Sequence, residues 1–165
     1  MKVFGITGWK NAGKTTLVER LVAEITGRGL RVSTVKHAHH DFDVDQPGRD
    51  SHRHRVAGAE QVLVASAARW ALMTELRGAP EPPLAALLAT LAPVDLVLVE
   101  GFKREPLPRI EIRRAAAPHP PIAPGDPLVV AIASDMALPD ERLPVLPLDA
   151  TADIAEFILT HLGRA

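Results

Sequence analysis

The fold of this chain is decided by the stretch Gly8-Trp9-Lys10-Asn11-Ala12-Gly13-Lys14-Thr15, which follows the short apolar run Val3-Phe4-Gly5-Ile6. The stretch has the form G-x-x-x-x-G-K-T, the pattern of a phosphate-binding P-loop between a strand and a helix. A helix is predicted from Lys14 to about Arg28, because apolar residues recur there at three- and four-residue intervals and glycines follow as stop signals.

The chemistry of this loop follows from its position at the start of a helix. Glycines let the backbone turn tightly, so that successive N–H groups and the positive end of the helix dipole point at a di- or triphosphate. We expect Lys14 to reach the phosphate oxygens and the Thr15 hydroxyl to bind a phosphate-bound Mg²⁺. A glycine-rich turn with a solvated lysine is the alternative, but it predicts neither the preceding strand nor Thr15. The predicted nucleotide-binding residues of the segment are Gly8, Lys10, Asn11, Ala12, Gly13, Lys14, Thr15 and Thr16.

Composition limits the class of protein. The 165 residues suffice for one α/β domain with a real core, and the net charge of −1, from 19 basic and 20 acidic residues, argues against a nucleic-acid or membrane surface. The absence of cysteine excludes disulfides, thiolate metal sites and cysteine nucleophiles. The first strand begins at the N-terminus without room for a signal peptide, and no apolar run approaches ~20 residues. We therefore expect a soluble cytoplasmic protein.

Apolar bursts of strand length alternate with helical stretches, which predicts an α/β fold with a mostly parallel central sheet and helices on both faces. We expect one P-loop nucleotide-binding domain over residues 1–165. The alternating segment 110–114 predicts an edge strand, and the proline-rich residues after it predict a semi-rigid loop. Further strands are predicted at 30–35, 61–65, 69–73, 94–99 and 128–133, and helices near 50–58, 82–91 and 151–162.

Histidine, aspartate and arginine are concentrated in residues 36–55. Loops at the carboxyl ends of neighbouring strands converge on the nucleotide in such folds, so Asp43 or Asp45 would hold Mg²⁺ directly or through water. A transition-metal site is an alternative, although no pair of histidines has a metalloenzyme spacing. A solvated charged loop is the other. The basic residues that would face phosphate or another anion are Arg49, Arg53 and Arg55.

Two further carboxylates follow predicted strands. Glu100 ends an apolar strand in the manner of a Walker B acid, which orients Mg²⁺ or its water, whereas Asp95 at the opposite end is predicted to be structural. Asp135 comes just after a late strand, where its carboxylate would accept hydrogen bonds from guanine N1–H and the 2-amino group. An exposed strand-end acid and a turn residue are the respective alternatives.

Taken together, these motifs resemble the MobB family, the accessory proteins of molybdopterin guanine dinucleotide biosynthesis. The resemblance covers nearly the whole chain in order. It is carried by the P-loop with Thr16, Lys36-His37-Ala38-His39-His40, Asp43-Val44-Asp45-Gln46-Pro47-Gly48-Arg49-Asp50-Ser51, Ala57-Gly58-Ala59, Val99-Glu100-Gly101-Phe102-Lys103 and Ala133-Ser134-Asp135.

The resemblance implies a GTP-binding protein with weak GTPase activity. It would assist the guanylyltransferase that attaches GMP to molybdopterin, with GTP and Mg²⁺ as cofactors. Its implied partners are a second copy of the chain, paired through strands near the middle or end, the guanylyltransferase and molybdopterin-bearing proteins. In this interpretation Lys14 and Glu100 are catalytic, Asp135 binds the base, and Thr15, Asp45 and Glu100 hold the metal.

Two other functions share some of these features. A P-loop small-molecule kinase would need a lid carrying arginines, for which residues 49–55 are the candidate segment. A metal-delivery GTPase would use the histidine-rich loop, but the cysteine ligands expected of such a protein are missing.

Overall fold

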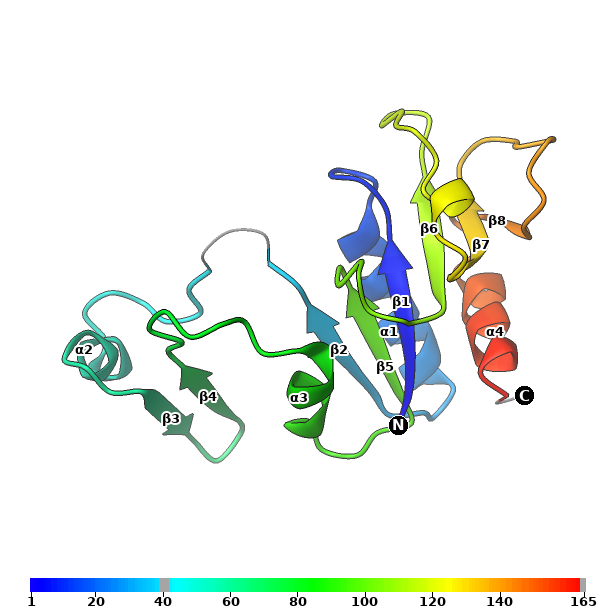
Figure 1. The fold of residues 1–165 in the computed structure, drawn as a ribbon. Coiled ribbons are helices and arrows are strands. Elements are labelled where there is room, and N and C mark those ends of the chain that lie inside the picture. Colours follow the sequence, from blue (N-terminus) through cyan, green and yellow to red (C-terminus); the bar gives the residue numbers. More distant parts are fainter. Residues whose placement is uncertain (39–41, 164–165) are drawn as a thin grey trace. The chain divides into compact units, whose positions relative to one another are not determined.

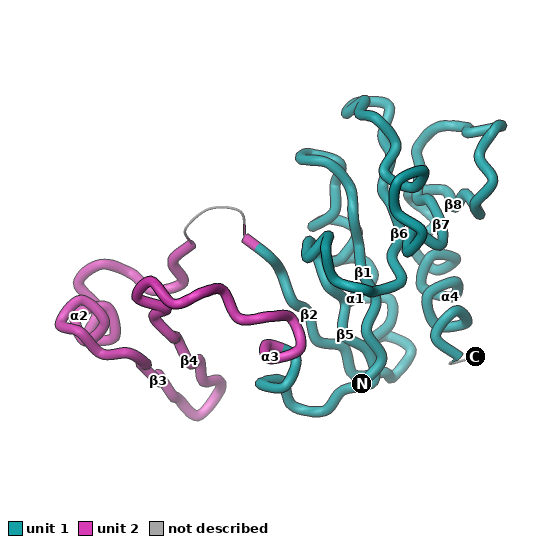
Figure 2. Tube along the Cα trace, in the orientation of Figure 1, with its two compact units in different colours: residues 1–37, 88–165 teal, residues 38–87 magenta. Residues whose placement is uncertain are grey.

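The computed structural model describes residues 1–38 and 42–163, which form two compact units (Figure 1). The first unit comprises Met1–His37 and Leu88–Ala165, and the second comprises Ala38–Leu87 (Figure 2). The second unit is thus an insertion in the sequence of the first.

The first unit contains a six-stranded sheet in the order β2-β5-β1-β6-β7-β8 (Figure 1). Every neighbouring pair in this sheet is parallel, which confirms the predicted α/β class. The predicted strands before the P-loop and at 30–35, 94–99 and 128–133 are all present. The strands are β1 (Lys2–Thr7), β2 (Val32–Lys36), β5 (Leu96–Glu100), β6 (Arg109–Arg113), β7 (Val129–Ser134) and β8 (Val145–Pro147).

Two helices of this unit, α1 (Lys14–Gly27) and α4 (Thr151–His161), pack against each other and against one face of the sheet. The α1 helix ends where its sequence predicts. Gly29 takes a φ of +83°, a left-handed conformation in which glycine avoids the Cβ penalty, and the N–H of Leu30 donates to the carbonyl of Ile25 (3.3 Å). The core beneath these helices comprises Phe4, Ile6, Leu17, Leu21, Ile25, Leu96, Leu98, Ile110, Ile112, Ile154 and Ile158, with smaller residues between them.

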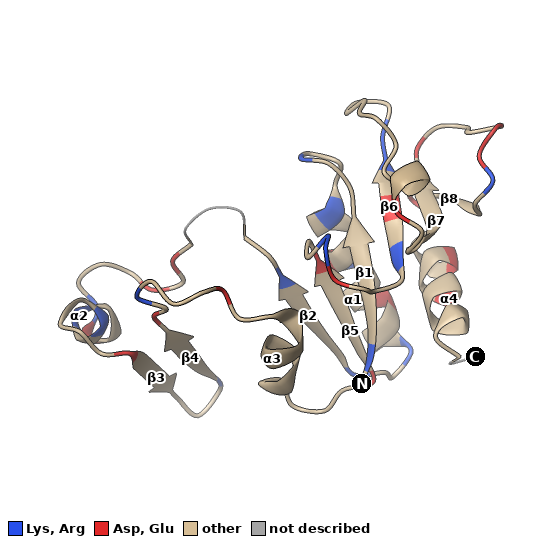
Figure 3. Ribbon diagram, viewed as in Figure 1, with Lys and Arg blue, Asp and Glu red and all other residues tan. Residues whose placement is uncertain are grey.

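The β6 strand is an interior strand between β1 and β7, so its prediction as an edge strand was wrong. The charged residue Glu111, which gave the segment its alternation, is buried at 1% exposed, and so is Arg109 just before the segment, at 2%. Figure 3 shows charges of both signs within this strand.

Backbone groups of two loops satisfy the buried charges of β6. The Arg109 guanidinium donates to the carbonyls of Lys103 (2.7 Å), Glu105 and Leu107 (3.1 Å). The Glu111 carboxylate accepts hydrogen bonds from the N–H groups of Ile122 (2.8 Å) and Ala123 (3.0 Å), next to the short 3₁₀ helix η1 (Ala123–Gly125), and an ion pair from Arg113 (2.8 Å). The two charged side chains therefore anchor the loops 102–108 and 114–128 to the sheet.

The second unit has its own two-stranded sheet, formed by β3 (Gln61–Ala65) and β4 (Trp70–Thr74). The two predicted strands are present, but they form an antiparallel hairpin and do not extend the parallel sheet. Residues 66–69 explain this, because so short a connection cannot make a parallel crossover. The unit's helix α2 (Asp50–Val56) contacts β3, and α3 (Leu84–Ala89) follows the hairpin in sequence.

None of the helices in the described part of the chain combines the length and the apolar character that a membrane span requires.

The Glu111 carboxylate provides a test of the fold. We expect Glu111→Ala to lower the free energy of unfolding by about 3 kcal/mol, because it leaves two part-buried backbone N–H groups without their acceptor and removes one of the two carboxylates that pair with Arg113. Urea unfolding followed by circular dichroism measures the change. The matched control is Glu60→Ala at an exposed position, which should stay within about 0.5 kcal/mol of the parent. Equal losses in the two variants would contradict the anchoring role.

Candidate functional site

The P-loop joins β1 to α1 and has the backbone that phosphate binding requires. Asn11 and Gly13 take positive φ angles of 65° and 88°, and Gly13 is the residue immediately before the helix. Gly13 has no side chain that could cap the helix, and the first turn of α1 has no acidic residue. The first backbone N–H groups of the helix therefore receive no carboxylate acceptor from that turn. The loop therefore favours an anion.

The Lys14 side chain folds back over this loop and contacts its backbone. Its ammonium donates to the carbonyls of Gly8 (3.1 Å) and Trp9 (2.8 Å). Burial lowers the pKa of Lys14 from its ordinary value, and the ammonium groups of Lys103 and Lys36 lower it too, whereas Glu100 raises it. The cation is thus held beside the backbone donors that would bind phosphate.

Thr15 and Glu100 meet at the carboxyl end of β5. The Thr15 hydroxyl donates to the two carboxylate oxygens of Glu100 at 3.1 and 3.3 Å, and Glu100 is only 9% exposed. A hydroxyl and a carboxylate are oxygen ligands of the kind that Mg²⁺ binds, so these two residues fit a magnesium ion shared with phosphate oxygens and water. At the other end of the strand, the Asp95 carboxylate accepts a hydrogen bond from the N–H of Arg31 (2.9 Å), as expected for a structural residue.

Lys36 also belongs to this cluster, although it was not among the candidates selected from the sequence. Its ammonium donates to the Thr15 hydroxyl (3.2 Å) and lies 3.7 Å from the Glu100 carboxylate. Lys36 is the last residue of β2 and is paired in register with Glu100. The strand order would have identified it, but the sequence does not give that order.

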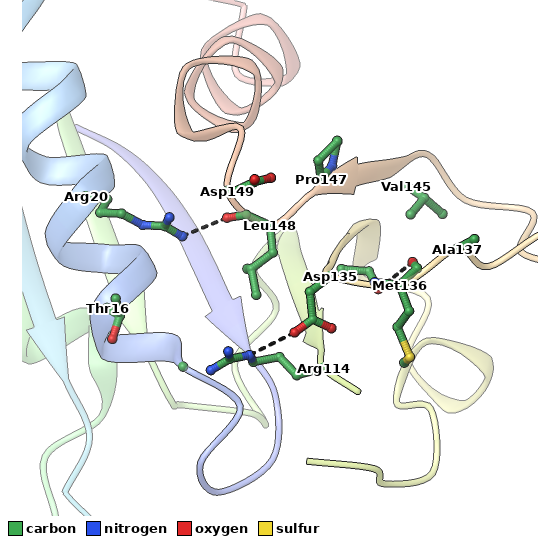
Figure 4. Close-up of a pocket in the computed structure, with 12 residues that line it drawn as sticks. Thr16, Arg20, Arg114, Asp135, Met136, Ala137, Val145, Pro147, Leu148 and Asp149 are labelled. Carbon is green, nitrogen blue, oxygen red and sulfur yellow. Dashed lines mark hydrogen bonds and ion pairs between the residues drawn. The ribbon is translucent and has the colours of Figure 1, made fainter. Parts of the chain in front are cut away.

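Asp135 lies in a cavity of about 640 Å³ that also contains Gly13 and Thr16 of the P-loop segment (Figure 4). The cavity thus connects the start of α1 to the predicted base-binding carboxylate, and its volume is typical of ligand sites. The Asp135 carboxylate accepts hydrogen bonds from the backbone N–H of Ala115 (2.8 Å) and from Arg114 Nε (3.2 Å). The hydrogen bond from the Ala115 N–H lowers the pKa of Asp135 below its usual value. The Arg114 guanidinium lowers this pKa too, whereas burial opposes the shift.

The remaining cavity wall comes from α1, the end of β7 and the segment that contains β8. Arg20 of α1 donates to the carbonyl of Leu148 (2.7 Å), which ties the helix to that segment (Figure 4). The other lining residues are Ser134, Met136, Ala137, Val145, Pro147 and Asp149. Apolar side chains therefore stand beside a few charged groups, as a heterocyclic base requires.

Trp9 connects the P-loop to the proline-rich segment. The indole N–H donates to the carbonyl of Pro120 (2.8 Å), and the His119 ring lies 5.4 Å from the indole ring. The Lys103 ammonium lies 5.0 Å from the indole centroid, a cation–π distance. The other predicted loop residues, Lys10 and Ala12, are exposed and buried respectively.

Asp45 belongs to the second unit, where its carboxylate has protein partners. It accepts hydrogen bonds from the Ser51 hydroxyl (2.8 Å) and Arg55 Nε (3.4 Å). Arg55 also pairs with Asp43 (2.8 Å) and Glu75 (2.7 Å), and its hydrogen bonds lower the pKa of Asp43. These contacts hold the unit together, and the ligand roles of Asp43, Asp45 and Arg55 remain predictions.

The transition-metal alternative depended on the histidine-rich loop. His39 and His40 lie outside the described residues, as does Asp41. Within the described ranges there is no group of three histidine, aspartate or glutamate residues placed to hold a metal ion.

Comparison with known proteins gives one family. Residues 3–135 match the family described as MobB, molybdopterin guanine dinucleotide synthesis protein B. The chain is 44% identical over 163 residues to a molybdopterin-guanine dinucleotide biosynthesis adapter protein of Haemophilus influenzae, a match that covers 94% of this chain and 86% of the relative. It is 40% identical over 165 residues to the protein of the same description in Escherichia coli, with 98% and 94% covered.

Solved structures agree with the sequence matches. The structure of a MobB protein homolog from Bacillus stearothermophilus superimposes with a TM-score of 0.72 at 26% identity, over 100% of both chains. A structure described as molybdopterin-guanine biosynthesis protein B superimposes with a TM-score of 0.74 at 26% identity, over 96% of this chain and 99% of that one. Both support the P-loop α/β architecture.

Gly13 provides a test of the loop geometry. We expect Gly13→Ala to lower the free energy of unfolding by about 1–2 kcal/mol, because a residue with a Cβ is strained at a φ of 88°. Chemical denaturation measures the loss. Gly27→Ala is the matched control, since open space surrounds that position within α1. Alanine there should raise the free energy of unfolding by about 0.5–1 kcal/mol. A Gly13→Ala variant as stable as the parent would show that the left-handed turn is not required.

Proposed function

The chain belongs to the MobB family of molybdopterin guanine dinucleotide synthesis proteins, and we propose from this premise that it is a GTP-binding adapter protein. The observation that carries the proposal is the single cavity that is lined both by Gly13 and Thr16 of the P-loop segment and by Asp135. A phosphate-binding backbone and a carboxylate that pairs with guanine donors are then the two ends of one nucleotide site.

The phosphate end depends on Lys14 and the first amides of α1. Lys14 exchanges its present acceptors, the carbonyls of Gly8 and Trp9, for phosphate oxygens, so that its charge is neutralised by the ligand. Lys36 extends the cationic surface on the other side of Thr15. The predicted contacts of Lys10, Asn11 and Ala12 are with the same phosphates.

Thr15 and Glu100 are the residues that hold magnesium in this proposal. Held by these two residues, Mg²⁺ would supply positive charge that offsets the charge of the phosphates. Glu100 keeps the Thr15 hydroxyl oriented toward the strand end and, as a buried carboxylate, orients water next to the phosphates. A ligand role for Asp45, whose oxygens accept from Ser51 and Arg55 in the second unit, stays a prediction from the sequence.

Hydrolysis by such a site is slow. Among the described residues that line the cavity none is glutamine, the residue that positions the attacking water in faster GTPases. Slow hydrolysis suits a protein that presents GTP to another enzyme. We propose that this enzyme is the guanylyltransferase that attaches GMP to molybdopterin, with molybdopterin-bearing proteins as further partners.

The second unit supports pairing of two copies. In the β3-β4 hairpin, Leu63 and Leu72 are partners in register, and both are exposed, at 60% and 47%. Trp70, two residues before Leu72 and thus on the same face, is 68% exposed. A two-stranded sheet with one bare apolar face is marginal alone, so a second copy is the proposed cover.

Nucleotide titration tests the proposed site. We expect Mg²⁺–GTP to bind the parent chain about tenfold to a hundredfold more tightly than Mg²⁺–ATP, because adenine lacks the two donors that pair with Asp135. Lys14→Ala should abolish binding of both triphosphates. Asp135→Asn should lose GTP and gain XTP, whose 2-position carries an oxygen. Isothermal calorimetry measures each affinity.

Glu60→Ala serves as the control in these titrations and should bind as the parent does. Equal affinity of the parent for ATP and GTP would contradict the guanine assignment. Rapid transfer of the terminal phosphate to a small hydroxyl compound, in place of hydrolysis by water, would instead support a P-loop kinase.

Sedimentation tests the pairing. We expect the parent chain to be a dimer and the double variant Trp70→Ser, Leu72→Ser to be a monomer with unchanged GTP affinity, because both residues lie outside the nucleotide cavity. Val145→Ser, at an exposed apolar position in the first unit, is the control and should remain dimeric. A monomeric parent, or a dimer that survives the double substitution, would exclude the hairpin face as the interface.

A further inference from the structure

Arg114 touches both ends of the nucleotide cavity. Its Nε donates to Asp135 Oδ2 at 3.2 Å, and its Nη1 lies 3.5 Å from the position that a Cβ would take on Gly13. Figure 4 shows the side chain reaching between the start of α1 and Asp135. One guanidinium thus links the base-binding carboxylate to the phosphate-binding loop.

Guanine and Arg114 need the same acceptor. The other oxygen of Asp135 accepts from the backbone N–H of Ala115 (2.8 Å), a donor that is fixed in the loop. The Arg114 side chain, by contrast, is 40% exposed and contacts the carboxylate through Nε with the outer nitrogens directed elsewhere. The N1–H and 2-amino donors of guanine would therefore displace Arg114 and leave Ala115 in place.

Arg114 has a second acceptor within reach once it is displaced. Gly13, which lies beside Nη1, is the residue immediately before α1, where the amides and helix dipole favour phosphate. A guanidinium has five donors in a planar fork that matches two phosphate oxygens, so it can exchange a carboxylate for a phosphate without moving its backbone.

We propose that Arg114 is a guanine-released phosphate-binding residue: a guanine base takes over Asp135, and the freed guanidinium then binds the phosphate chain of the same nucleotide. This inference rests on the proposed function, because it requires GTP in this cavity. Its consequence is a specificity that exceeds base pairing alone. Adenine leaves Arg114 on Asp135, so ATP loses both the base contact and the arginine–phosphate contact.

The test compares Arg114→Ala with the parent chain, using guanosine and Mg²⁺–GTP as separate probes. Guanosine, which has no phosphate, should bind the variant about two- to fivefold more tightly, because an exposed ion pair no longer competes for Asp135. Mg²⁺–GTP should bind the variant about tenfold more weakly, because a charge-assisted phosphate contact is lost. The affinity for Mg²⁺–ATP should change less than about twofold.

Controls separate this role from a structural one. Arg142→Ala removes an exposed arginine outside the cavity lining and should leave all three affinities as in the parent. Arg114→Lys, which keeps the charge, should recover part of the GTP affinity. Thermal unfolding confirms that each variant is folded.

The inference is decided by whether Arg114→Ala changes the affinities for guanosine and for GTP in opposite directions. Weaker binding of both by Arg114→Ala, or no change in either, would overturn it, although GTP binding by the parent would still support the proposed function. A parent chain that binds no GTP would overturn both.

Discussion

Parallel pairing of β1 with β5 and β6 is the constraint on which the whole site depends. Because the strands run in one direction, their carboxyl ends meet at one edge of the sheet. The register pairs Glu100 with Ile6 on one side and with Lys36 on the other. The Thr15 hydroxyl at the start of α1 then falls within hydrogen-bond distance of a carboxylate that is 85 residues away in the sequence.

The same edge of the sheet is supported from β6, whose charges are buried. Desolvating Arg109 and Glu111 is costly, and backbone carbonyls and N–H groups of two loops offset that cost. One of these loops carries Lys103 and the other carries Pro120, and both contact Trp9. The P-loop residue Trp9 is therefore contacted by two loops that are themselves fixed by the buried side chains of Arg109 and Glu111. A proline-rich stretch with little secondary structure is thus ordered by the sheet beneath it.

Sequence reasoning reached the features that local pattern determines. The P-loop, the strand ending at Glu100 and the carboxylate Asp135 were each readable from a few consecutive residues, because turn geometry and strand length are local properties. What it missed depends on strand order. Lys36 and Arg114 became visible only when β2 was found beside β5 and β6 beside β7. The strand 110–114 was placed at an edge because sequence alone does not reveal that Glu111 would find buried partners.

The balance of charge around Lys14 is the electrostatic reason why this edge of the sheet would favour a bound anion. The ammonium groups of Lys36 and Lys103 act on Lys14 together with burial, and a single carboxylate, that of Glu100, opposes them. Since burial and like charges lower the pKa of Lys14, keeping this ammonium charged has a cost to stability. A polyanion removes that cost by pairing with the cations, and its binding energy is added to the folding energy of the loop. In the proposed function, nucleotide affinity and the stability of the P-loop would therefore depend on the same electrostatic interaction.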